Sequence, residues 1–299
     1  MKQIMTKNNR QSTGIAGLDE KLGGGLLPGT MTVLVGSSGI GKTQFGIQYA
    51  NAGLKQEKQR GVLFDMASRI DPQGHREYAK KLFGWKLAEE EPETEIDFAN
   101  LLCKKQPLGD YFRALSYQGK RLTKRDLDFD QWNDWQAELS KHLDTTIAFF
   151  FRHFIRGTRR FVVDGIEPVT HQGESIQFEL LEYVYHQIIR KEPDWLARDL
   201  FRQHYRENET AIKKNLYRKE HIGCLVCYTS GETSLDAMIE KPLDEGDLLA
   251  GANTIIYLGK IRDGIKFRRA MYVSKHRGSV CPDDILFYDI NGKGLFLVD

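Results

Sequence analysis

The sequence predicts an α/β protein with a mainly parallel central sheet flanked by helices, a C-terminal β-hairpin and two helical insertions. Short apolar runs rich in β-branched residues alternate with helical stretches along much of the chain, which is typical of parallel strands joined by crossover helices. Near the C-terminus, residues 285–290 and 294–298 bracket Asn291-Gly292-Lys293, a pattern that predicts a hairpin turn. Hydrophobic residues are 40% and charged residues 28% of the 299 residues, as expected for a globular protein with a substantial core.

The chain is expected to form one domain over residues 12–299, preceded by a disordered tail over residues 1–11. One insertion is expected at about residues 83–151, where apolar side chains at steps of three or four from Phe129 to Ile147 predict an amphipathic helix. The other is expected at about residues 194–220, as a charged helix that is either solvated or a partner-binding surface. The core strands before the hairpin are expected at residues 32–35, 61–64, 160–163, 222–228, 254–258 and 270–274.

Charge and cysteine usage narrow the functional classes. A formal net charge of +2 gives no argument for a nucleic-acid or membrane partner. No apolar stretch approaches the roughly 20 residues of a membrane span, and the polar start of the chain does not resemble a secretory signal. Cys224 and Cys227 fall on an expected strand, where their odd separation points them to opposite faces. We therefore expect a cytoplasmic protein without a membrane partner, and buried thiols rather than a metal or redox pair.

The strongest functional signal is a phosphate-binding loop, or Walker A motif, which fits G-x-x-x-x-G-K-[ST] and lies between an expected strand and an expected helix. In this setting, backbone N–H groups and the start of the helix hold phosphate oxygens. Lys42 supplies a charge near the terminal phosphates, and the Thr43 hydroxyl can join the shell of a Mg²⁺ ion. The predicted cofactors are therefore ATP and Mg²⁺. The predicted nucleotide-binding residues are Gly36, Ser37, Ser38, Gly39, Ile40, Gly41, Lys42, Thr43 and Gln44.

Two further residues at strand ends are candidates for the same site. Asp164 ends the apolar run that begins at Arg160, and a carboxylate on a neighbouring strand organises Mg²⁺ in such proteins. We expect it to act through water, although an Asp at this place can also cap the next segment. Thr229 follows the expected strand at 222–228 and is either a sensor of the terminal phosphate or a turn residue.

Several motifs together resemble one family. Residues 12–19 (STGIAGLD), residues 23–29 (GGGLLPG) and the phosphate loop resemble the opening of the KaiC-like branch of RecA-superfamily ATPases. Residues 273–279 (VSKHRGS) resemble the K-x-R-G-S element of that branch, and residues 288–298 resemble its closing strands. The resemblance covers about residues 12–72, 159–174 and 222–298. It implies a RecA-like core, ATP bound between subunits of a ring that usually has six members, and Lys275 and Arg277 reaching a neighbour's ATP.

The chain departs from this family at the end of the second core strand. The family has a pair of Glu residues there, and one of them activates the attacking water. When residues 61–68 are aligned with the family's second core strand in the most natural register, Ala67 and Ser68 take the places of the two Glu residues. Neither side chain can act as a base near neutral pH. Candidate replacements are Asp65, Asp71 and Glu167, with Glu167 expected slightly ahead of Asp65. The sequence thus predicts ATP binding with slow or impaired hydrolysis.

Three functions follow from this pattern. The favoured one is a homo-oligomeric, nucleotide-dependent assembly switch that presents its insertions to a protein partner. A DNA-dependent recombinase or helicase-like ATPase is less favoured, because residues 230–250 hold six acidic residues and one Lys, which repel a phosphate backbone. For that function the remaining basic candidates are Arg152, Arg156, Arg159 and Arg160. An autophosphorylating kinase is the third.

Overall fold

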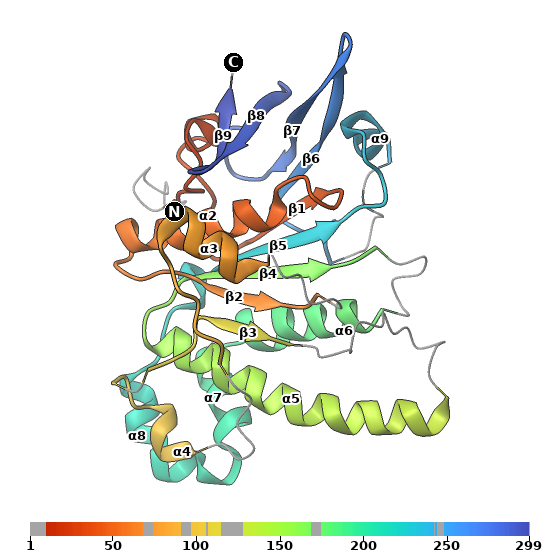
Figure 1. The fold of residues 1–299 in the computed structure, drawn as a ribbon. Helices are drawn as coiled ribbons and strands as arrows, with labels where there is room; N and C mark the ends of the chain where they lie inside the picture. The colour runs from red at the N-terminus through yellow and green to blue at the C-terminus, as the bar shows by residue number, and fades with distance from the viewer. Residues whose placement is uncertain are drawn as a thin grey trace.

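Nine strands form a single sheet in the described part of the chain (Figure 1). The computed structural model describes residues 10–67, 74–90, 97–105, 107–114, 128–168, 175–241, 243 and 248–298. The order of the strands is β3-β2-β4-β5-β1-β6-β7-β8-β9. All pairings from β3 to β6 are parallel, and those from β6 to β9 are antiparallel. The predicted α/β architecture with its C-terminal hairpin is confirmed.

Each expected strand is present. The six parallel strands are β1 (Met31–Gly36), β2 (Val62–Asp65), β3 (Tyr111–Arg113), β4 (Arg160–Ile166), β5 (Gly223–Thr229) and β6 (Thr254–Asp263). The antiparallel strands are β7 (Lys266–His276), β8 (Leu286–Asn291) and β9 (Gly294–Val298). Two differences stand out: β6 and β7 extend into a long projecting hairpin, and β3 was not predicted.

Helices cover both faces of the sheet. Their order is α1 (Leu18–Lys21), α2 (Lys42–Gln56), α3 (His75–Phe83), α4 (Phe98–Leu101), α5 (Phe129–Ile155), α6 (Ile176–Tyr183), α7 (Pro193–Phe201), α8 (Tyr205–Lys214) and α9 (Leu235–Glu240). Short π or 3₁₀ turns are η4 (Val184–Ile189), η5 (Arg202–His204) and η6 (Lys219–His221). The buried side chains form two clusters, one on each face. Cys224 belongs to one cluster and Cys227 to the other, so the prediction that they point to opposite faces is confirmed.

The insertion expected at 83–151 is part of the sheet as well as a helical addition. Its strand β3 pairs in parallel with β2, and its helix α5 confirms the predicted helix. Phe149 and Phe150 of α5 pack with Phe64 of β2 and Phe112 of β3 in one aromatic cluster. This segment therefore reaches the ends of the strands that carry the site.

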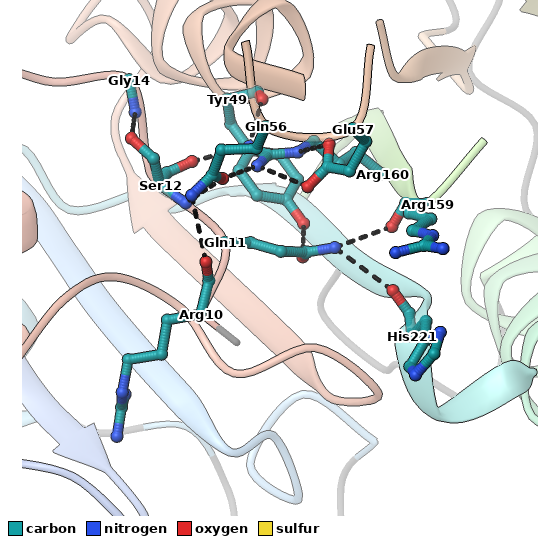
Figure 2. Close-up of polar contacts among 10 residues, drawn as sticks. All are labelled: Arg10, Gln11, Ser12, Gly14, Tyr49, Gln56, Glu57, Arg159, Arg160 and His221. Atoms are coloured by element: carbon teal, nitrogen blue, oxygen red, sulfur yellow. Dashed lines mark hydrogen bonds and ion pairs between the residues drawn. The ribbon is translucent and has the colours of Figure 1, made fainter. Parts of the chain in front are cut away.

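The N-terminal segment is folded from a point earlier than expected. Gln11 is buried and forms an antiparallel bridge with Leu26. Its side-chain amide donates to the carbonyl oxygens of Arg159 and His221 (Figure 2). The disordered tail was expected over residues 1–11, but Gln11 belongs to the folded part of the chain. Residues 1–9 lie outside the described ranges.

A buried arginine joins the N-terminal segment, α2 and β4. Arg160 has no exposed surface, and it donates from Nε and Nη2 to the Glu57 carboxylate at 2.7 and 2.9 Å. Its Nη1 donates to the carbonyl oxygens of Ser12 and Tyr49 at 2.6 and 2.9 Å (Figure 2). The guanidinium also lies over the Tyr49 ring, 4.9 Å from its centroid. Arg160 is the first residue of β4, as expected from the sequence, and its contacts hold α2 against that strand.

Candidate nucleotide site

A cavity of about 700 Å³ lies where parallel strands of the sheet end. Its walls come from the phosphate loop, the ends of β2 to β5, the start of α3, and residues of β7 and β8. In open α/β sheets, ligands bind in the crevice outside the carboxyl ends of the strands. The volume is also in the usual range for a small-molecule site.

The glycines of the phosphate loop are required by its backbone. β1 ends at Gly36 and α2 begins at Lys42. Gly39 and Gly41 have φ angles of +73° and +118°, which only glycine adopts easily. A Cβ at Gly36 would lie 2.6 Å from the Leu258 carbonyl oxygen. The loop therefore takes the tight turn that lets backbone N–H groups face a phosphate.

The Lys42 ammonium lies inside this loop. Its Nζ donates to the carbonyl oxygens of Gly36 and Ser37 at 2.8 and 2.9 Å. Burial lowers the pKa of Lys42, and the negative charge of Asp164 opposes that shift. The ammonium is thus a fixed positive charge beside the cavity, next to the positive end of α2.

Thr43 and Asp164 meet at the same place. The Thr43 hydroxyl donates to Asp164 Oδ2 at 2.7 Å. Burial alone would raise the pKa of Asp164, but hydrogen bonds from His75 and Thr43 and the charges of His75 and Lys42 lower it to about 2. An ionised carboxylate and a hydroxyl are hard oxygen donors, the kind that Mg²⁺ prefers. Gln44 also lines the cavity, and its buried Oε1 has no hydrogen-bond partner in the described structure.

A second carboxylate lies beside Asp164. Asp65 is the last residue of β2 and pairs in register with Asp164. The Tyr111 hydroxyl of β3 donates to Asp65 Oδ2, and the backbone N–H of Ala67 donates to Asp65 Oδ1 at 2.8 Å. His75 lies between the two acids, with Nε2 2.9 Å from Asp164 Oδ2 and Nδ1 3.6 Å from Asp65 Oδ2. The site therefore holds an acid pair bridged by an imidazole.

The two candidate bases, Asp65 and Glu167, differ in whether they line the cavity. Asp65 lines the cavity, whereas Glu167 is not among the residues that line it. The Glu167 backbone N–H donates to Gln177 Oε1 at 3.0 Å. Asp65 reaches the cavity because β2 continues to that residue, and the catalytic role of either acid stays a prediction. Ser68 and Asp71 lie outside the described ranges.

The other expected residues divide into two groups. Thr229 ends β5 and lines the cavity, as does Ala67. Lys275 and Arg277, on and just after β7, are not among the lining residues. Lys275 Nζ donates to the Ala250 carbonyl oxygen at 2.7 Å, and Arg277 is exposed. Their expected role toward a neighbouring subunit stays a prediction.

Sequence reasoning missed two members of the site, His75 and Tyr111. Neither belongs to a motif that the sequence shows. His75 reaches the acids because it begins α3, and Tyr111 does so because β3 pairs with β2. Arg76, Arg113 and Arg269 also line the cavity and add positive charge.

The fold and the site together define a P-loop nucleotide-binding protein with a RecA-like core. The model of the KaiC ATPase family matches residues 11–188, which is more than half of the chain. The chain therefore belongs to the KaiC family of ATPases, and the resemblance seen in its motifs is confirmed.

Two individual proteins show how far the similarity extends. The crystal structure of a KaiC-like protein from the hyperthermophilic archaeon Pyrococcus horikoshii OT3 matches with a TM-score of 0.52 and 14% identity, over 97% of this chain and 99% of that one. At this identity the match shows a shared fold. The circadian clock protein KaiC2 of Synechocystis sp. is 45% identical over 51 residues, which are 17% of this chain and 9% of that protein.

Two features are absent from the described ranges. No cluster of three or more His, Cys, Asp or Glu side chains has an arrangement that suits a metal ion. No helix combines the length and hydropathy needed to cross a membrane.

Proposed function

We propose that this protein binds ATP with Mg²⁺ between subunits and acts as a nucleotide-dependent assembly switch that hydrolyses ATP slowly. One observation carries the proposal: the phosphate loop and the Thr43–Asp164 pair are complete, while Ala67 lines the cavity where the family has a catalytic Glu. A site that keeps its binding groups but lacks its usual base favours holding the nucleotide over consuming it.

Each binding residue has a definite task in this proposal. Backbone N–H groups from Gly39 to Thr43 and the start of α2 hold the β- and γ-phosphates, and the Lys42 ammonium adds a point charge. Thr43 and Asp164 are the groups that would hold Mg²⁺, which when bound neutralises charge on the phosphate oxygens. Thr229 lines the cavity from β5, which supports a role in bonding a terminal phosphate oxygen.

Slow hydrolysis follows from the groups near the γ-phosphate position. Loss of a general base costs about 10²–10⁴-fold in rate. Asp65 is the carboxylate best placed to recover part of that loss, since it lines the cavity beside Asp164. Its two oxygens accept hydrogen bonds from the Tyr111 hydroxyl and the Ala67 N–H.

Assembly is proposed from the position of two cations outside the cavity. Lys275 and Arg277 follow the family's K-x-R-G-S pattern yet do not line the cavity of their own chain. A cation supplied from outside the pocket stabilises charge on the transferring phosphoryl group. We therefore propose that a neighbouring subunit supplies them, in a ring that is expected to have six members.

The protein partner is proposed to bind the insertions. On α7, Trp195 is 61% exposed and lies under Arg198, whose guanidinium carbon is 5.7 Å from the ring centroid. Exposed aromatic and Arg side chains are typical anchors of protein interfaces.

Nucleic acid stays the less favoured partner. Of the arginines considered for it, Arg160 and Arg152 are buried and pair with Glu57 and Glu90 at 2.7 and 3.0 Å. Side chains engaged in this way are not available to contact a phosphate backbone.

The proposal is tested by analysing assembly and turnover together. Size-exclusion chromatography with light scattering, with and without ATP and Mg²⁺, should show a nucleotide-dependent increase in mass. Phosphate release should stay below about 1 s⁻¹, the low end of usual enzyme rates. The Lys42→Ala variant should neither bind ATP nor assemble. An unchanged mass would contradict the switch, and faster turnover would contradict slow hydrolysis.

A further inference from the structure

We infer that Tyr111, on the strand β3 that the first insertion adds to the sheet, is a positioning residue for ATP hydrolysis. It orients the Asp65 carboxylate so that this group takes the proton of the attacking water. The inference rests on the proposed function, because it needs ATP in the cavity. It gives the insertion a direct part in the nucleotide site.

The backbone fixes β3 firmly at the end of β2. Leu63 of β2 is the register partner of Tyr111, and the Leu63 N–H donates to the Asp110 carbonyl oxygen at 3.0 Å. Just after β3, the Ala114 N–H donates to the carbonyl oxygen of Asp65 itself at 2.8 Å. Hydrogen bonds therefore flank Tyr111 on both sides and set its position relative to Asp65.

The other edge of β3 is also paired. The Tyr111 N–H donates to the Ala88 carbonyl oxygen at 3.1 Å, and the Tyr111 carbonyl oxygen accepts from the Glu90 N–H at 2.8 Å. The tyrosine is 3% exposed, and the Arg76 guanidinium lies over its ring at 5.6 Å. A side chain packed and paired in this way has little freedom, as a group that orients another must.

The hydrogen bond has a fixed direction. Burial, together with the charge and the hydrogen bond of Asp65, raises the pKa of Tyr111 well above its ordinary value. The phenol thus stays protonated and donates to Asp65 Oδ2. The Ala67 N–H donates to Oδ1, and His75 Nδ1 lies 3.6 Å from Oδ2. These contacts restrict rotation of the carboxylate, and each oxygen has more than one lone pair with which to accept.

Hydrolysis exchanges one bond at the γ-phosphorus for another. The water oxygen forms a bond to the γ-phosphorus as the bond from that phosphorus to the bridging oxygen of ADP breaks. The water gives one proton to the Asp65 carboxylate, which later releases it to solvent. Tyr111 keeps its own proton throughout. The products are ADP and inorganic phosphate.

Four variants, each compared with wild type, test this inference. The measurements are single-turnover hydrolysis of ATP, with enzyme in excess, and calorimetric ATP binding. Tyr111→Phe removes only the hydroxyl and should slow hydrolysis about 10-fold, with ATP affinity unchanged. Asp65→Asn should slow it at least about 100-fold. The double variant should be no slower than Asp65→Asn, since the hydroxyl acts through Asp65. Tyr205→Phe is the matched control, because it removes a Tyr–Asp194 hydrogen bond elsewhere, and it should hydrolyse ATP at the wild-type rate.

Several results would overturn the inference. These are a Tyr111→Phe rate within twofold of wild type, an Asp65→Asn variant with full activity, or a double variant clearly slower than Asp65→Asn. The inference would also fail if wild type hydrolysed ATP no faster than Lys42→Ala. If that wild-type sample still bound ATP, the proposed binding function would stand. Absence of ATP binding by wild type would instead remove the proposed function and the inference together. If Tyr111→Phe does not fold, Asp65→Asn still tests whether the Asp65 carboxylate takes the proton of the attacking water, and full activity of that variant would refute the inference.

Discussion

The Thr43 hydroxyl donates a hydrogen bond to Asp164 Oδ2 at 2.7 Å, across 121 residues of sequence. Thr43 lies in the first turn of α2 and Asp164 lies in β4, so the contact joins the end of the phosphate loop to another strand of the sheet. At the opposite ends of the same two elements, Arg160 bonds to Glu57. The site is therefore held by two elements that are tied together at both ends.

The first prediction concerns the acid of this pair. Asp164→Asn removes the negative charge that favours a cation and should weaken Mg²⁺-dependent ATP binding about 10- to 100-fold, the usual cost of losing a group that supports a metal. Calorimetric titrations with Mg²⁺ and with EDTA measure the effect. Asp289→Asn, on the exposed side of β8, is the matched control and should bind normally. Equal affinities for wild type and Asp164→Asn would contradict the assigned role.

The second prediction concerns pH and the nucleotide-free protein. Folding lowers the pKa of Asp164 from 3.8 to about 2, so the folded state holds the ionised form more strongly than the unfolded state does. The resulting stability, about 2 kcal/mol, is present above pH 4 and is lost as pH falls toward 2. Urea unfolding from pH 2.5 to 5 should show this loss in wild type but not in Asp164→Asn. Parallel pH profiles for the two proteins would contradict the lowered pKa.

The third prediction concerns the buried ion pair. Arg160→Met leaves Glu57 without its partner in the interior and should lower the free energy of unfolding by about 3–5 kcal/mol. The double variant with Glu57→Leu should recover much of that loss. Arg202→Met breaks an exposed pair with Asp144 and should cost less than about 1 kcal/mol. A loss for Arg160→Met as small as that of Arg202→Met, measured by urea unfolding, would contradict the structural role.

The fourth prediction concerns Ala67, which the sequence register is expected to place where the family has a catalytic Glu. Ala67 lines the cavity, and Ala67→Glu places a carboxylate there. Hydrolysis should rise by about 10²-fold or more, within the usual range for a general base, as measured by phosphate release. Ala67→Gln has the same shape without a basic carboxylate and should stay slow. An equal increase for both variants would show that the missing base does not limit the rate.

The core of the fold was predictable because its signals are local. The strands β1, β4 and β5 are continuous apolar runs, and the glycines of the phosphate loop mark one turn between a strand and a helix. The register of β2 was harder to judge. The strand was expected at residues 61–64, yet its last residue is Asp65, which still pairs with the parallel neighbours β3 and β4.

The rest of the site depends on tertiary pairing that leaves no local pattern. β3 is three residues long, too short for an alternating signal, so neither the strand nor Tyr111 was visible. His75 reaches the acids only because α3 begins beside them. The outer part of the β6–β7 hairpin is exposed on both sides, with Ile265 95% exposed, and thus lacks the hydrophobic alternation that marks a half-buried strand.

The most direct test of the account is a calorimetric titration of ATP into the purified protein in the presence of Mg²⁺. We predict saturable binding with about one ATP per chain. Lys42→Ala should lose this binding, because it removes the ammonium charge that lies inside the phosphate loop. A wild-type protein that gives no binding heat at any temperature tested, and whose thermal unfolding ATP does not shift, would contradict it.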